Sequence, residues 1–133
     1  MEKNKIKTQV VVIGSGPGGY TAAFRAADLG LDVTIIERNT NLGGVCLNRG
    51  CIPSKAYLHL ANIINEAKSS SNMGVSFSNP KIDIEKIFSW KESIVANLNK
   101  GIYKLAKQRN IKTIGGSASF LSANKLLVED KQD

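Results

Sequence analysis

The chain is poor in the residues that hold metals or cross-link secreted proteins. Its 133 residues include two cysteines and one histidine, short of the four Cys or His ligands of a structural zinc site. No apolar run approaches the roughly 18 residues of a membrane span. Residues 1–5 are mostly charged and polar and lack the apolar region of a signal peptide. We therefore expect a cytoplasmic protein with no membrane partner, where reducing conditions permit cycling disulfides and few structural ones.

Acidic side chains are also scarce, because 11 Asp and Glu stand against 18 Lys and Arg, a net charge of +7. Such a balance raises the question of nucleic-acid binding. The lysines, however, are scattered along the chain and lack interleaved aromatic residues. We therefore expect a solvated basic face and no nucleic-acid partner. The length corresponds to one domain at most.

The N-terminal part of the chain has the pattern of a strand, a glycine-rich turn, a helix and a second strand. The β-branched run at 8–13 predicts a strand buried on both faces. The Ala-rich segment 20–30 ends in glycine and predicts a helix, and 32–37 predicts a second strand that ends in an acid. The turn at 14–19 matches G-x-G-x-x-G. This order predicts an α/β fold with a parallel sheet.

The same turn predicts a dinucleotide site. Gly14 makes the tight turn, Gly16 lets the backbone approach a pyrophosphate, and Gly19 lets helix and strand pack closely. The helix N-terminus favours phosphates, and Glu37 can accept hydrogen bonds from ribose hydroxyls. A plain surface acid at a strand end is the alternative for Glu37. The motif leaves open whether the dinucleotide is a nicotinamide or a flavin.

Two cysteines, Cys46 and Cys51, follow this unit. On an ideal helix their Cα atoms would lie roughly 8–9 Å apart, whereas a disulfide needs less than about 7 Å. The chain between them must leave regular helix, and Asn48 and Gly50 are predicted to take positive φ there. Pro53 fits only the first turn of a helix, so a helix is predicted from Cys51, where its N-terminus favours a thiolate. The pattern predicts a redox disulfide, with two inert buried cysteines as the alternative.

A nearby redox disulfide favours a flavin, which can pass two electrons to sulfur more readily than nicotinamide can. The run at 43–56, behind this glycine turn, resembles the pyridine nucleotide–disulfide oxidoreductases, which include lipoamide dehydrogenase, glutathione reductase and mercuric reductase. Its Ile-Pro-Ser-Lys at 52–55 is most similar to bacterial lipoamide dehydrogenases, since glutathione reductases tend to carry Val-Pro-Lys-Lys there. The resemblance extends from Gln9 to about Phe120. Arg49 departs from it, because a small apolar residue is commoner at that position.

The resemblance implies a Rossmann-like FAD-binding domain and roles for individual residues. Cys51 would lie against the flavin ring as the charge-transfer thiolate, and Cys46 would be the interchange thiol that meets the dithiol substrate. Lys55, one turn beyond Cys51, would stabilise reduced anionic flavin, with a solvated helix lysine as the alternative. Ala118 stands near a backbone contact to the adenine, where glycine is frequent. The cofactor-binding positions implied are Gly14, Gly16, Pro17, Gly18, Gly19, Glu37, Arg38, Gly43, Gly44, Val45, Cys46, Cys51, Lys55 and Ala118.

The resemblance also implies an activity and its partners. Protein-bound dihydrolipoamide, on the lipoyl domain of a 2-oxo acid dehydrogenase or glycine cleavage complex, would be oxidised through Cys46 and Cys51. Electrons would pass to tightly bound FAD and then to NAD, in a homodimer. A related activity like that of glutathione or mercuric reductase is the alternative.

The sequence matches only the N-terminal part of such an enzyme. It has no second G-x-G-x-x-G for an NAD domain, and His59 is its only histidine, so the His–Glu pair of a C-terminal dimerisation domain is absent. We therefore expect residues 1–133 to form an incomplete FAD-binding domain. By itself this would be a flavin-binding fragment without turnover, and one that is marginally stable and self-associates.

The rest of the sequence predicts packing elements. Helices are expected at 53–67 and 83–109, with a break at the serine run before Gly74. Strands are expected at 111–114, 117–121 and 125–129, the last two as the start of a small antiparallel β-meander. Apolar residues at helical spacing predict a core-facing stripe on the second helix: Ile94, Val95, Leu98, Ile102, Leu105 and Ala106.

Overall fold

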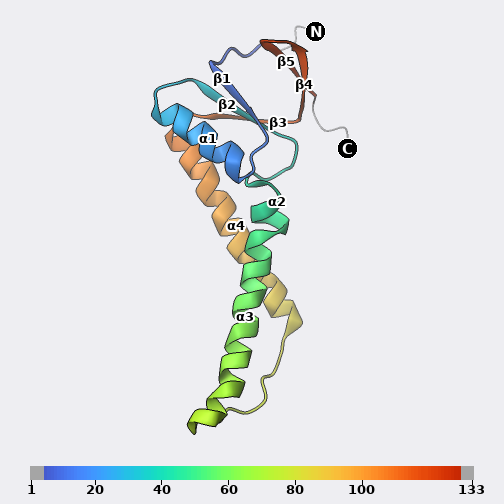
Figure 1. Ribbon diagram of the computed structural model, residues 1–133. Coiled ribbons are helices and arrows are strands. Elements are labelled where there is room, and N and C mark those ends of the chain that lie inside the picture. The colour runs from blue at the N-terminus through green and yellow to red at the C-terminus, as the bar shows by residue number, and fades with distance from the viewer. Residues whose placement is uncertain (1–4, 130–133) are drawn as a thin grey trace.

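A computed structural model describes residues 5–129, and a three-stranded parallel sheet organises its fold (Figure 1). The strands lie in the order β1-β2-β3, and both neighbouring pairs are parallel. Helix α1 connects β1 to β2, as the glycine-turn pattern predicts. The bounds are β1 Val10–Ile13, α1 Pro17–Asp28, β2 Val33–Glu37 and β3 Lys112–Gly115. The predicted parallel α/β fold is confirmed.

The strand that is buried on both faces is β2 and not β1. All five residues of β2 are buried, whereas in β1 Val11 is 38% exposed and Ile13 is 49% exposed. Val10 and Val12, on the other face of β1, pack against the core. The expectation that segment 8–13 is buried on both faces is therefore wrong. The reason is tertiary, since the core lies against only one face of β1 and the described residues leave its other face partly uncovered.

Three further helices carry the chain from β2 to β3. The short helix α2 leads directly into α3, and α3 packs beside α4 so that the two project from the sheet as an arm (Figure 1). The chain turns at the end of this arm, where Gly74 takes φ +89° after a 3₁₀ turn, as the predicted break requires. The bounds are α2 Gly44–Arg49, α3 Cys51–Ser69, the 3₁₀ turn Ser70–Met73 and α4 Ile84–Gln108.

Helix α4 turns a narrower and more polar stripe to the core than its apolar residues predict. Leu98 and Leu105 are 42% and 41% exposed. A polar residue, Asn99, is buried between Val95 and Ile102 on the same face. The prediction that both leucines belong to the stripe is therefore wrong. Asn99, which the predicted stripe did not include, is part of it.

An antiparallel hairpin follows the sheet. Its strands are β4 (Ser117–Ser122) and β5 (Lys125–Glu129), which confirms the predicted strand pair. The Gly116 N–H donates to the Glu37 carbonyl at 2.9 Å, which joins the hairpin to the end of β2. Within residues 5–129, no helix combines the length and the apolar character needed to cross a bilayer. Residues 1–4, the start of the polar N-terminal segment, and 130–133 lie outside the described part.

Candidate functional site

The two cysteines form a disulfide at the junction of two helices. Cys46 lies within α2, Cys51 is the first residue of α3, and their Cα atoms are 4.7 Å apart. The predicted pairing and the predicted helix start at Cys51 are both confirmed. The side chain of Cys51 is exposed, whereas that of Cys46 is half-buried.

The bend between the cysteines is not the left-handed turn that the sequence predicts. Asn48 is helical, and Gly50 has φ −128° and ψ −101°, so the expectation of positive φ at both residues is wrong. A break of one residue between two helices already brings the sulfurs together. Gly50 still suits this place, because an added Cβ would lie 3.3 Å from the Val45 carbonyl oxygen, a tight contact.

The start of α3 favours negative charge on Cys51. Among the described residues, no side chain caps this helix end, so its first N–H groups and the positive end of its dipole stay available. Cys46 also lies in a first turn, but α2 has only six residues against the nineteen of α3, so fewer peptide dipoles add up at its start. If the disulfide opens, Cys51 is therefore the better thiolate. Lys55, one turn further on, is exposed, as is His59 after it.

The glycine turn presents an open, uncapped helix end. Helix α1 begins at Pro17, three residues before the predicted start, and no side chain of residues 5–129 caps it at Gly16. The N–H groups of Gly18 and Gly19 belong to the first turn and have no intrahelical acceptor. A Cβ added at Gly16 or Gly18 would meet no described atom within 4 Å. A phosphate group can therefore approach this turn closely.

The redox segment packs directly on the glycine turn. The Gly43 N–H donates to the Ser15 carbonyl at 2.8 Å. Gly44 has φ +62°, and an added Cβ there would lie 2.6 Å from Gly16 Cα. The fold thus brings the two sequence motifs together, with the chain entering α2 against the glycine turn. Val45, in α2, is 70% exposed.

Glu37 is a buried carboxylate with four hydrogen-bond donors. One oxygen accepts from the Ser15 N–H at 2.8 Å and from the Ser15 hydroxyl, and the other accepts from the Asn39 N–H at 2.7 Å and side-chain amide at 2.9 Å. Burial alone would raise the pKa of Glu37, but the bonds from Ser15 and Asn39 outweigh it and hold the pKa below its ordinary value. Glu37 therefore ties the glycine turn to the end of β2. Arg38 is exposed beside it, and Ala118 is half-buried opposite Val128 in the hairpin.

Sequence reasoning missed three of the polar residues that build this site. Ser15 occupies a variable position of G-x-G-x-x-G, and Asn39 follows the acid, so the motif gives no signal for either. Asn99 lies 51 residues from its partner Asn48. Its signal is its spacing, because it falls in register with Val95 and Ile102 on the buried face of α4.

The geometry joins a disulfide to a glycine turn with an open helix end, and a family model described as pyridine nucleotide-disulphide oxidoreductase matches residues 8–132. The chain belongs to the pyridine nucleotide–disulfide oxidoreductase family. It is 54% identical over 125 residues to a dihydrolipoyl dehydrogenase of Vibrio parahaemolyticus, which covers 94% of this chain and 26% of the relative.

Two further relatives of the family carry the same name. The dihydrolipoyl dehydrogenase of Buchnera aphidicola from Acyrthosiphon pisum is 56% identical over 129 residues, 97% of this chain and 27% of the relative. That of Staphylococcus aureus is 46% identical over 127 residues, 96% of this chain and 27% of the relative. The chain thus spans about a quarter of the length of the curated relatives it matches.

Proposed function

We propose that this chain supplies the FAD-binding and disulfide-bearing part of a dihydrolipoyl dehydrogenase. The observation that carries the proposal is the Cys46–Cys51 disulfide, whose helix leads off from the glycine turn through Gly44. The names of the relatives support the substrate, dihydrolipoamide on a partner protein, and NAD as the final electron acceptor. In this proposal residues 1–133 are the N-terminal part of the FAD-binding domain of a homodimeric cytoplasmic enzyme.

The cysteines would exchange electrons by attack at sulfur. A substrate thiolate attacks the Cys46 sulfur, the S–S bond breaks, and Cys51 leaves as the thiolate that the start of α3 stabilises. The second thiolate of the substrate then attacks the substrate sulfur of the mixed disulfide, which closes the substrate's own disulfide and releases the Cys46 thiolate. Two electrons have moved from the substrate dithiol, now a cyclic disulfide, to the cysteine pair. When bound, FAD would supply the two-electron acceptor that lets the pair reform its disulfide.

The residues at the glycine turn fit the diphosphate of such a cofactor. The uncapped α1 end and the open space at Gly16 and Gly18 leave donors and room for it, and the missing Cβ of Gly44 lets the chain pack closely behind the turn. The exposed Cys51 and Lys55 would face the flavin ring. At Glu37 a ribose hydroxyl would have to replace a present donor, and the Asn39 side-chain amide is the one that can leave without opening the turn.

We expect Cys46 and Cys51 to be oxidised and reduced as a pair. Alkylation followed by mass spectrometry should find no free thiol before mild reductant and two thiols appearing together after it. Cys46→Ser is the matched control, since it leaves one thiol that alkylates without reductant. Cysteines that alkylate before reduction, or that resist alkylation in both states, contradict the proposal.

We expect the chain to bind FAD at the glycine turn. Gly16→Ala places a methyl group in open space within the protein but in the path of the diphosphate, so FAD affinity should fall about tenfold or more, equal to at least roughly 1.4 kcal/mol. Gly101→Ala is the control. Its added Cβ also meets no described atom within 4 Å, but Gly101 lies in α4, outside the glycine turn. Fluorescence titration with FAD measures both. Equal affinities for the two variants would count against this site.

A further inference from the structure

Asn48 lies between the two cysteines, and its side-chain amide is fully engaged. Its N–H₂ group donates to the Leu42 carbonyl at 3.0 Å and to the Gly44 carbonyl at 2.8 Å. Its carbonyl oxygen accepts from the Asn99 amide at 2.8 Å. The first two bonds are local to α2 and the loop before it, whereas the third joins α2 to α4 across 51 residues.

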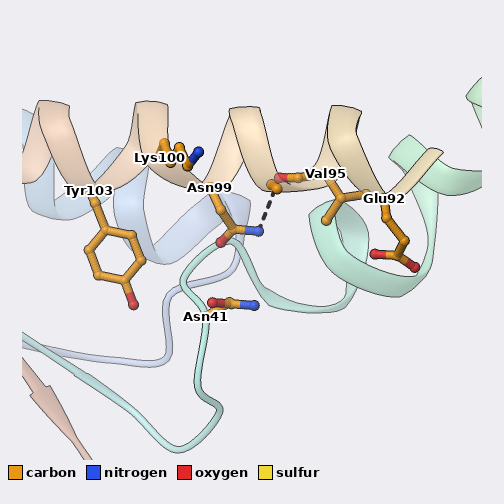
Figure 2. A pocket seen from close by; sticks show the side chains of 7 residues that line it. Asn41, Glu92, Val95, Asn99, Lys100 and Tyr103 are labelled. Atoms are coloured by element: carbon orange, nitrogen blue, oxygen red, sulfur yellow. Dashed lines mark hydrogen bonds between the residues drawn. The ribbon is translucent and has the colours of Figure 1, made fainter. Parts of the chain in front are cut away.

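Asn99 makes this bond at a cost to its own hydrogen bonding. The residue is 6% exposed, and its second N–H donates to the Val95 carbonyl at 3.2 Å. Its carbonyl oxygen is buried without a partner among residues 5–129. Figure 2 shows the side chain pointing from α4 toward the loop that carries Asn41. An unpaired buried carbonyl is unfavourable, so a leucine would serve packing in this stripe at least as well. Packing alone therefore does not account for the amide.

We propose that Asn99 is a positioning residue for the Cys46–Cys51 pair, acting through Asn48. The inference rests on the proposed function, in which the disulfide opens and closes. While the disulfide is closed, the S–S bond itself fixes α2 against α3. Once the disulfide opens, α2 and α3 stay joined covalently only by the backbone at Gly50. Non-covalent contacts must then hold α2 in place. The Asn48–Asn99 bond is then one of the contacts that keep the two sulfurs within reach.

The expected effect is therefore on the equilibrium between dithiol and disulfide. Two thiols that are held close together have a high effective concentration toward each other. Loosening α2 in the dithiol state lowers this effective concentration. Reduced dithiothreitol gives two electrons and two protons to the cysteine pair and becomes its own cyclic disulfide, so a buffer of both forms sets the equilibrium. Asn99→Leu should make disulfide closure about tenfold less favourable, which corresponds to a potential about 30 mV more positive.

The controls separate positioning from general packing. Asn99→Leu removes an unpaired buried carbonyl but also takes the donor from the Asn48 oxygen, and because these effects oppose each other the unfolding midpoint of the oxidised chain should change little. Tyr103→Phe is the matched control, because the Tyr103 hydroxyl also joins α4 to a loop, but at the Thr40 carbonyl (3.1 Å) outside the cysteine segment. It should not change the equilibrium. In an Asn48→Ala background, Asn99→Leu should have no further effect, because both act through one bond.

The outcomes distinguish the inference from the function on which it rests. A parent disulfide that neither opens nor closes in the dithiothreitol buffers overturns the proposed function and the inference together. A parent that cycles while Asn99→Leu keeps the same equilibrium overturns the inference alone. An equal shift in Tyr103→Phe, or additive effects of Asn48→Ala and Asn99→Leu, also overturns it. Asn99→Ala carries the same test if the leucine variant does not fold.

Discussion

Gly19→Ala should unfold this chain at a temperature roughly 10 °C lower than the parent. A Cβ at Gly19 would lie 2.0 Å from the Gly14 carbonyl oxygen, which is a backbone atom and cannot rotate away. Relief requires α1 to move off β1, and such overpacking costs about 3 kcal/mol. For a domain of this size that loss corresponds to the stated shift. Thermal unfolding followed by circular dichroism measures it.

The neighbouring Gly18→Ala supplies the matched control. The substitution is chemically identical and lies in the same first turn of α1, but its Cβ would meet no described atom within 4 Å. Since alanine favours helix over glycine, the variant should be as stable as the parent or more stable by up to about 1 kcal/mol. Equal losses in the two variants would mean that close helix–strand packing is not what Gly19 provides.

The parts of the fold that the sequence predicted well are those set by neighbouring residues. The strand, the turn and the helix around the G-x-G-x-x-G run depend on local periodicity and on glycines that allow a tight turn. The structure contains all three. The cysteine pairing was predictable for a similar reason. With Pro53 confined to a first helical turn, the helix start at Cys51 follows, and a single break suffices to join the sulfurs.

The errors concern features that only tertiary neighbours decide. Segment 8–13 has the composition of a strand covered on both faces, yet its burial depends on what packs against each face, and the core meets β1 only at Val10 and Val12. Likewise, the predicted core stripe of α4 contains only apolar residues, whereas in the structure Asn99 is also buried on this face and forms a hydrogen bond with Asn48. The spacing of apolar residues predicts which face of a helix is buried. It cannot predict that a polar residue on that face forms a hydrogen bond with an amide far away in the sequence.

The bend at Gly50 shows a different limit. Geometry required a departure from helix between the cysteines, and positive φ at Asn48 and Gly50 was the commonest solution. The structure instead keeps Asn48 helical, where its amide can reach the Leu42 and Gly44 carbonyls, and places the whole bend at one glycine. The need for a bend was predictable, but its position depended on side-chain bonds that the sequence does not display.

Glu37→Gln should destabilise the chain by about 2 kcal/mol at neutral pH. The carboxylate accepts four hydrogen bonds from Ser15 and Asn39, whereas glutamine keeps one acceptor oxygen and turns an N–H₂ group toward the donors on the other side. Bonds to a charged group are worth about 1.5–3 kcal/mol, and buried donors left without acceptors add to the loss. Urea unfolding of parent and variant at pH 7 measures the difference.

The same difference should shrink in acid. Because the folded chain holds the pKa of Glu37 below its ordinary value, the carboxylate stabilises the fold fully above the unfolded pKa, and this contribution is lost as the pH falls through the lower folded pKa. Glutamine does not titrate, so parent and variant should differ most above about pH 6, and the difference should shrink progressively as the pH falls below about 4.5 toward the folded pKa. Glu66→Gln is the control, since Glu66 is exposed on α3 and its replacement should change stability by less than about 0.5 kcal/mol at either pH. A Glu37→Gln effect that stays constant from pH 7 to pH 4 would show that the charge of Glu37 does not hold the glycine turn to β2.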